Sequence, residues 1–381
     1  MLRPKSNNSS ISVVSHNFPS DTLKRLRSHF SRSTHADTIF PFSALSDKEW
    51  NLFLNSNAVP LYPSHRLVRE KKGIITARKN PTSPGMMAAM DICPRRLIDT
   101  YSLKLVEFGN AEIIPSYAIL SHRWVQGEEV LYAEFLQSQD GGGKFSKPKE
   151  GYRKIEAACR QAREDGIRFI WIDTCCVEQG NHVDVAANIT SMYGYYQNAK
   201  VCYVYLADIE KHDMFNKEDR LGIHQRSEWL YRGWTLQELI APRTVVFFNK
   251  HWERIGDKYK LREKLYEVTA VPSLVLSGKQ PVQNVDVLTR MSWSFSRRTT
   301  KIQDGAYCLQ GLLGVSIEPN YDESSLASFN RLGKALFDAH PELKDRLGIN
   351  KDLFRDPNSD SFLHLLLNRF YNARDTINNS R

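Results

Sequence analysis

The sequence predicts a doubly wound α/β domain with a mainly parallel sheet and helical additions, and two observations support this fold class. Four apolar runs of strand length alternate with helical patterns through the middle of the chain, which is the order of parallel strands joined by crossover helices. Each run is continuously apolar, as expected of strands that helices cover on both faces. The four runs are Tyr117–Leu120, Phe169–Ile172, Val201–Leu206 and Thr244–Phe248.

Helical patterns fill the connections between these runs. Tyr152–Glu164 places apolar residues at helical spacing, and Gly166 stands where the end of a helix favours glycine. Val183–Asn198 repeats this pattern, and Arg226–Ile240 is predicted as a third helix that ends before Pro242. Further predicted elements are the short strands Arg96–Asp99 and Lys104–Phe108 and the helices Lys258–Leu265, Arg297–Leu313, Phe329–Leu336 and Ser361–Ile377.

These patterns divide the 381-residue chain into four parts. Residues 1–92 are predicted as a basic, partly disordered N-terminal extension, 93–257 as the α/β domain, 258–340 as its helical continuation and 341–381 as a C-terminal helical tail. Met1–Ser116 contains 16 Lys/Arg and 9 Asp/Glu, which supplies +7 of the net charge of +9. A solvated arm and an arm that contacts nucleic acid or an acidic membrane remain alternatives, and no nucleic-acid motif accompanies it. The basic segment Ser20–Arg32 is a weak match to a mitochondrial targeting helix.

The composition excludes several classes of protein. Hydrophobic residues make up 41% of the chain and charged residues 25%, as in ordinary globular proteins. No apolar run reaches the roughly 18 residues that a membrane span needs. Six cysteines without a CxxC pair indicate buried thiols in a reducing cytosol, with a nucleophilic cysteine as the alternative, so we expect a cytoplasmic protein without a metal centre. The motifs of classical dinucleotide dehydrogenases, P-loop proteins, zinc proteases and serine hydrolases are absent.

Polar residues follow the predicted strands at the edge where open parallel sheets bind ligands. The first strand is followed by Ser121, His122 and Arg123, the second by Asp173 and the third by Asp208. His122 is a candidate general base or proton donor, and a structural histidine is the alternative. Asp173 is a candidate for substrate binding, and a helix-capping role is the alternative.

The segment 227–239 is the most informative candidate site. On a helix, Trp234 and Glu238 are four residues apart and share a face. An aromatic ring beside a carboxylate suits a nucleotide or a nicotinamide ring bound near its ribose, and the carboxylate could stabilise an oxocarbenium-like transition state. The alternative is a core tryptophan with Glu238 paired to Arg232 or Arg243.

Several long motifs, in order, resemble the fungal heterokaryon incompatibility (HET) domain family over roughly Pro94–Val315. The motifs are Tyr117–Trp124 (YAILSHRW), Trp171–Gln179 (WIDTCCVEQ), Ser191–Leu206, Arg232–Pro242 (RGWTLQELIAP) and the segment from Arg290 to Leu309. This chain departs from the family pattern at Val125, where glycine is usual, at Val185–Ala187, where acidic residues are usual, and around Ser316–Ser325.

The resemblance implies an effector of self/non-self recognition and programmed cell death. The family is also distantly similar to TIR domains, which implies a TIR-like, flavodoxin-like fold and puts Glu238 in a catalytic role in NAD⁺ hydrolysis. NAD would be the substrate and not a bound cofactor, in a cleft formed by Ser121, His122, Arg123, Trp124, Asp173, Arg232 and Trp234. The alternative is a non-enzymatic signalling module. Both interpretations imply self-association and a separate sensor or incompatibility partner, with no clear role for nucleic acid.

Overall fold

A computed structural model describes residues 92–109, 112–139, 149–210 and 226–347, which all belong to one of two compact units of the chain. The N-terminal extension up to Asp91, with its predicted helix Ser20–Arg32, lies outside the described residues. The predicted helix Ser361–Ile377 lies outside them as well. The division of the chain at 92/93, 257/258 and 340/341 stays a prediction.

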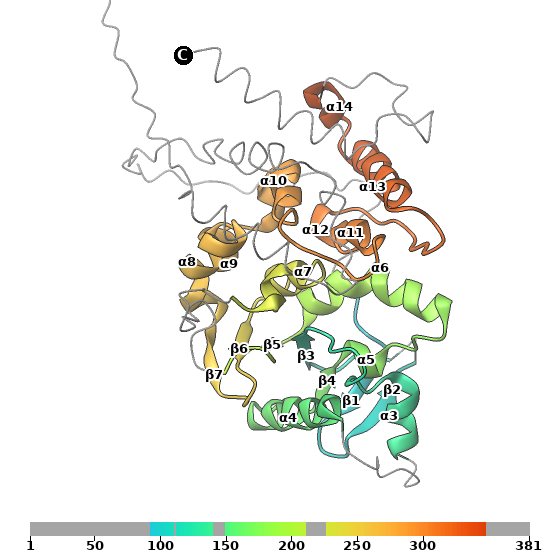
Figure 1. Cartoon of the computed structure of the whole chain (residues 1–381), viewed down its shortest axis with the longest axis vertical. Helices are drawn as coiled ribbons and strands as arrows, with labels where there is room; N and C mark the ends of the chain where they lie inside the picture. The colour runs from blue at the N-terminus through green and yellow to red at the C-terminus, as the bar shows by residue number, and fades with distance from the viewer. Residues whose placement is uncertain (1–91, 110–111, 140–148, 211–225, 348–381) are drawn as a thin grey trace, which may run out of the picture. The chain divides into compact units, whose positions relative to one another are not determined.

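A seven-stranded sheet is the centre of the described structure (Figure 1). Its strands are β1 (Arg96–Asp99), β2 (Lys104–Glu107), β3 (Tyr117–His122), β4 (Phe169–Trp171), β5 (Val201–Tyr205), β6 (Val245–Phe248) and β7 (Arg254–Asp257). The spatial order is β2-β1-β4-β3-β5-β6-β7. The four predicted apolar runs are confirmed as the parallel strands β3, β4, β5 and β6, which lie side by side. All six residues of β3 are buried, as its apolar run predicts for a central strand.

The sheet is mixed, because the four central strands are parallel as predicted but the edge strands pair antiparallel. β1 runs antiparallel to β2 and also to β4, and β7 runs antiparallel to β6. A few residues join β1 to β2 and β6 to β7, and connections this short permit only antiparallel pairing. The strand β7 was missed because its four residues, Arg254–Asp257, carry charge at both ends and no apolar run.

Helices cover both faces of the sheet, as the doubly wound class predicts. The crossover helices are α3 (Tyr132–Gln139), α4 (Glu150–Glu164), α5 (Asp173–Cys176), α6 (His182–Asn198) and α7 (Thr235–Ile240). Figure 1 shows α4 on one side of the sheet and α6 and α7 on the other. The chain leaves β3 for β4 and then crosses back to β5 on the opposite side of β3. The gap between the ends of β3 and β5 is therefore the topological switch point, where sheets of this kind bind ligands.

The predicted helix Arg226–Ile240 is wrong, because a 3₁₀ turn, η2 (Glu228–Tyr231), precedes the separate helix α7. The break lies at Gly233, where an added Cβ would stand 2.5 Å from Cγ2 of Thr299. Here the backbone pairs with a distant segment instead of continuing a helix. The amide of Gly233 donates to the carbonyl of Arg298 at 2.8 Å, and the amide of Arg298 donates to the carbonyl of Tyr231 at 2.6 Å. Because Gly233 has no side chain, the backbone at this point can lie close to Arg298 and Thr299 of the later helical region.

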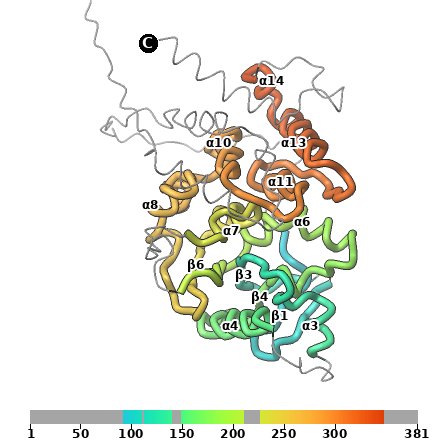
Figure 2. Tube along the Cα trace, in the orientation of Figure 1, coloured from blue at the N-terminus to red at the C-terminus, as the bar shows by residue number. Residues whose placement is uncertain are grey.

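Short helices make up the rest of the described chain, coloured orange to red in Figure 2. They are α8 (Lys258–Thr269), α9 (Ser273–Leu276), η3 (Val282–Asn284), α10 (Val287–Ser292), α11 (Asp304–Tyr307), α12 (Gln310–Leu313), α13 (Ser325–Ala339) and α14 (Glu342–Leu347). The predicted helix Arg297–Leu313 is wrong, because only its second half is helical, in two short pieces. The predicted helix Phe329–Leu336 is confirmed within α13. Among the described helices none is long and apolar enough to cross a bilayer.

Candidate functional site

The ends of β3 and β5 flank a small pocket at the topological switch point. Its volume is about 20 Å³, and it is lined by Arg123, Val125, Tyr205, Leu206, Ala207, Asp208 and Trp229. A space of this size holds about one water molecule and is far smaller than the hundreds of Å³ of a typical ligand site. The pocket lies where the sequence places a ligand, but in this conformation it is closed to a nucleotide.

Glu238 lies on α7 and points to the carboxyl end of β3. Its side chain is only 6% exposed. Ser121 Oγ donates a hydrogen bond to Glu238 Oε2, and Ser121 Oγ in turn accepts one from Trp229 Nε1 at 2.8 Å. Because Trp229 lines the pocket, one hydroxyl and one indole connect the buried carboxyl to the pocket wall. The sequence placed Ser121 at a strand end and Glu238 on a helix of the same proposed cleft, and the structure brings the two side chains into contact.

Burial controls the charge of Glu238. Burial raises the pKa of Glu238 to about 8, although hydrogen bonds with Ser121 and Tyr196 act in the opposite direction. The carboxyl is therefore mostly neutral at pH 7. The Tyr196 hydroxyl also donates to the carbonyl of Leu120 at 3.0 Å.

Arg232, one of the two arginines considered as a partner of Glu238, acts on it through its charge, which lowers the pKa of that carboxyl. Arg232 Nη1 also donates to Thr300 Oγ1 at 2.7 Å. Trp234 hydrogen-bonds with Asp304 of α11, whereas Glu238 faces β3. The hydrogen bonds of Arg232 with Thr300 and of Trp234 with Asp304 thus reach the later helical region.

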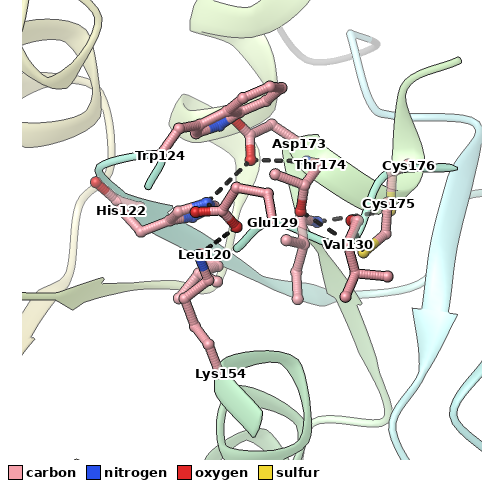
Figure 3. A network of polar contacts seen from close by, with 12 residues as sticks. Leu120, His122, Trp124, Glu129, Val130, Lys154, Asp173, Thr174, Cys175 and Cys176 are labelled. Carbon is pink, nitrogen blue, oxygen red and sulfur yellow. Dashed lines mark hydrogen bonds and ion pairs between the residues drawn. The ribbon is translucent and has the colours of Figure 1, made fainter. Parts of the chain in front are cut away.

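His122 is at the centre of a second polar cluster, drawn in Figure 3. Its Nε2 lies 3.6 Å from Glu129 Oε2 and 3.7 Å from Asp173 Oδ1, and the ring is 1% exposed. Lys154, rising from α4, places Nζ 2.5 Å from Glu129 Oε2. Burial opposes the ionisation of Glu129, but His122 and Lys154 outweigh it and hold the pKa of Glu129 at about 2. The cluster therefore contains a buried carboxylate that stays charged through the neutral pH range.

Asp173 joins this cluster from the start of α5. Its Oδ1 accepts from the amide of Thr174 at 2.8 Å, and its Oδ2 accepts from Trp124 Nε1 at 2.7 Å. Asp208 does not contact this cluster; it accepts from Ser227 Oγ at 2.8 Å and from the amide of Glu228 at 2.7 Å. Asp208 therefore fixes η2 and, with it, the pocket-lining indole of Trp229.

Several residues of the site had no clear signal in the sequence. Glu129 follows the first strand by seven residues with a loop between them, and Lys154 occupies a core position of a helix where an apolar residue would be usual. Arg297 is 1% exposed, and its Nη1 donates to the carbonyl of Arg232 and to Thr235 Oγ1, both at 2.9 Å. A fully buried guanidinium of this kind holds the first turn of α7 in place. Trp229 was inside the segment that the sequence singled out, but its contact with Ser121 spans 108 residues.

Comparison with known proteins fits this arrangement. Residues 117–222 match the family model described as Heterokaryon incompatibility protein (HET), which includes the motifs of β3, β4 and β5. The chain contains a HET domain. A curated relative of the HET domain region is the Vegetative incompatibility protein HET-E-1 of Podospora anserina, which is 40% identical over 221 residues. The aligned part is 58% of this chain and 16% of that protein, so the chain spans about a sixth of its relative. No solved structure matches the chain significantly.

The match to the HET domain model ends at residue 222, before η2 and α7. His122 and Asp173 lie inside the matched residues, and Glu238 lies beyond them. None of the six cysteines forms a disulfide, and five of them are buried, as the sequence predicts. Burial raises the pKa of Cys176 to about 12, so this thiol is a poor nucleophile.

Proposed function

We propose that this HET domain protein is an effector of heterokaryon incompatibility that causes programmed cell death by hydrolysing the N-glycosidic bond of NAD⁺. The family match and the name of the Podospora relative support the incompatibility role. The protein acts in the cytoplasm, responds to a separate sensor or incompatibility partner, and self-associates to become active. The basic N-terminal arm is outside this proposal.

One observation carries the chemical part of the proposal. A buried carboxyl, Glu238, is linked through Ser121 and Trp229 to the pocket at the switch point of the sheet. In the reaction, water adds to the anomeric carbon of the nicotinamide ribose, the bond from that carbon to the nicotinamide nitrogen breaks, nicotinamide leaves with the bonding electron pair, and a proton is released. A carboxylate at this place would bind the ribose hydroxyls and stabilise the positive charge that develops on the ring.

The conformation of the pocket sets a condition on this activity. A volume of about 20 Å³ does not admit NAD⁺, so the pocket opens before the substrate binds. Opening also hydrates Glu238, which removes the main cause of its raised pKa and favours the ionised form that the chemistry needs. Arg123, at the pocket wall, then pairs with a substrate phosphate. The closed form keeps the carboxyl neutral and inactive.

The test is nicotinamide release from NAD⁺ by the purified full chain, monomeric and assembled, beside the Glu238→Gln variant. Glutamine keeps the size of the side chain and its hydrogen bond with Ser121 but cannot ionise. We expect release by the assembled wild type and a loss of at least about a hundredfold in the variant, which is typical for removal of a charge-stabilising group. Equal release by both proteins would remove Glu238 from the mechanism.

A non-enzymatic signalling module is the second candidate, and the closed pocket favours it. If assembly alone causes cell death, Glu238 serves as a neutral hydrogen-bonding group in the core. Expression of wild type and Glu238→Gln in fungal cells separates the two functions. Undiminished killing by the variant, with no nicotinamide release from assembled wild type, supports the module. Loss of killing with fold and assembly intact supports the enzyme.

A further inference from the structure

Three residues directly after β3 form one wall of the pocket. We call Arg123–Val125 the strap, because Arg123 and Val125 line the pocket while the side chains of Trp124 and Val125 are 39% and 41% exposed. Because Trp124 is partly exposed, apolar packing alone does not fix the position of its side chain, and a specific interaction is needed. The position of the strap decides whether anything larger than water enters the pocket.

Two carboxylates hold the strap. Trp124 Nε1 donates to Asp173 Oδ2 at 2.7 Å, and the amide of Val125 donates to Glu129 Oε1 at 2.9 Å. A turn returns the chain so that Glu129 can reach back to Val125, with the amide of Glu128 bonded to the Val125 carbonyl at 3.1 Å and Gly127 at φ +81°. This positive φ is the one that the third residue of a tight turn requires.

The two attachments differ in strength. Glu129 is 7% exposed, and its ion pair with Lys154, itself 6% exposed, makes it costly to separate. The side chain of Asp173 is 26% exposed, so water competes for its bond to Trp124. Figure 3 shows His122 between the two carboxylates, with Trp124 above the cluster and Lys154 below. The titratable groups that face His122 are thus Glu129 and Asp173, with Lys154 behind Glu129.

We propose that the strap is the gate of the pocket: it opens by release of Trp124 from Asp173, while the Glu129–Lys154 pair holds its other end and acts as the fixed point of the motion. Trp124 and Glu129 are positioning residues, because they act through the pocket wall and not on a reacting atom. The gating itself is independent of the ligand, and only its consequence for NAD⁺ rests on the proposed function.

Hydrogen exchange of the full chain tests the gate. Trp124→Phe keeps an aromatic ring but removes the indole N–H, and Asp173→Ala removes the acceptor. We expect each variant to speed exchange of the amides in 123–127 by about three- to tenfold, with β5 and β6 unchanged, since one partly exposed hydrogen bond is lost. The double variant should add little to Asp173→Ala in 123–127, because Asp173→Ala already removes the acceptor of the Trp124 bond. Trp252→Phe, an aromatic change in the β6–β7 turn, is the matched control and should leave 123–127 unchanged.

Unchanged exchange in 123–127, faster exchange throughout the described elements, or fully additive effects of the two changes would each overturn the gate. Nicotinamide release measured on the same samples separates this result from the proposed function. Faster local exchange without release by any assembled protein supports the gate and counts against NAD⁺ hydrolysis. Release without faster local exchange in Trp124→Phe supports hydrolysis and overturns the gate.

Discussion

Replacing Glu238 by glutamine should remove a pH dependence of stability that burial of the carboxyl creates. Burial raises the pKa of Glu238 from its ordinary value of 4.5 to about 8. Between these two pH values the folded protein holds a proton that the unfolded chain releases, so the stability of the wild type falls as the pH rises. One pKa unit corresponds to about 1.4 kcal/mol, so this group changes the free energy of unfolding by on the order of 4 to 5 kcal/mol across the interval. Glutamine, which does not titrate, has no such change.

Urea unfolding of both proteins at pH 5, 6, 7 and 8 measures this effect. The difference in unfolding free energy, wild type minus Glu238→Gln, should fall by about 1 kcal/mol or more for each pH unit through this range and level off above pH 8. Taking the difference cancels the titration of the other groups. A constant difference would refute the reasoning, since it would mean that the hydrogen bonds from Ser121 and Tyr196 keep the buried carboxylate ionised. Above pH 8 the difference in unfolding free energy between wild type and Glu238→Gln is constant whether or not the reasoning holds, so pH 5 to 8 is the decisive range.

Three further predictions concern the packing around the site. Glu129→Gln should lower the unfolding free energy at pH 7 by about 3 to 5 kcal/mol, because it leaves the buried Lys154 ammonium without its partner, and a urea titration measures this. The dependence of stability on pH should have the opposite sign for Glu129, whose pKa is lowered to about 2. Its contribution to the free energy of unfolding is fully present above about pH 4.5 and is lost as the pH falls towards 2. Acid unfolding of wild type and Glu129→Gln measures this loss. Gly233→Ala should cost about 1 to 3 kcal/mol, seen as a lower melting temperature, because the new methyl group would stand 2.5 Å from Thr299 Cγ2; an unchanged melting temperature would show that Thr299 moves aside freely.

The sequence was sufficient for the centre of the fold because local pattern and burial agree there. The apolar runs of β3 and β5 are fully or almost fully buried, and the predicted helices α4 and α6 lie in the connections from β3 to β4 and from β4 to β5. The edges were less predictable, since a four-residue strand such as β7 carries too few side chains to show a period. The break at Gly233 was missed because its cause is Thr299, which is 66 positions away along the chain.

The site was predictable by location but not by partner. Ser121, His122, Arg123 and Asp173 were expected at the strand ends, and they lie there. Pairing of Glu238 with an arginine was one of two interpretations of the sequence, and neither included its hydrogen bond with Ser121, 117 residues earlier in the chain. Nothing in a local pattern records such a contact. The burial of Lys154 could not be predicted from the sequence either. Its position in α4 has the spacing of a core residue, and only the facing Glu129 explains an ammonium group there.

The backbone pairing of Arg232 with Arg298 has a practical consequence for how the protein can be divided. This ladder contact, together with the guanidinium of Arg297, ties the first turn of α7 to residues well past the sheet. A fragment that ends after β7 would keep all the described strands but lose the contacts of Arg297 and Arg298 that hold the start of α7, the helix that carries Glu238. Deletion experiments that aim to isolate a minimal active fragment should therefore retain the chain at least through α12. Inactivity of a shorter fragment would reflect a loosened α7 and not an essential role of the residues removed.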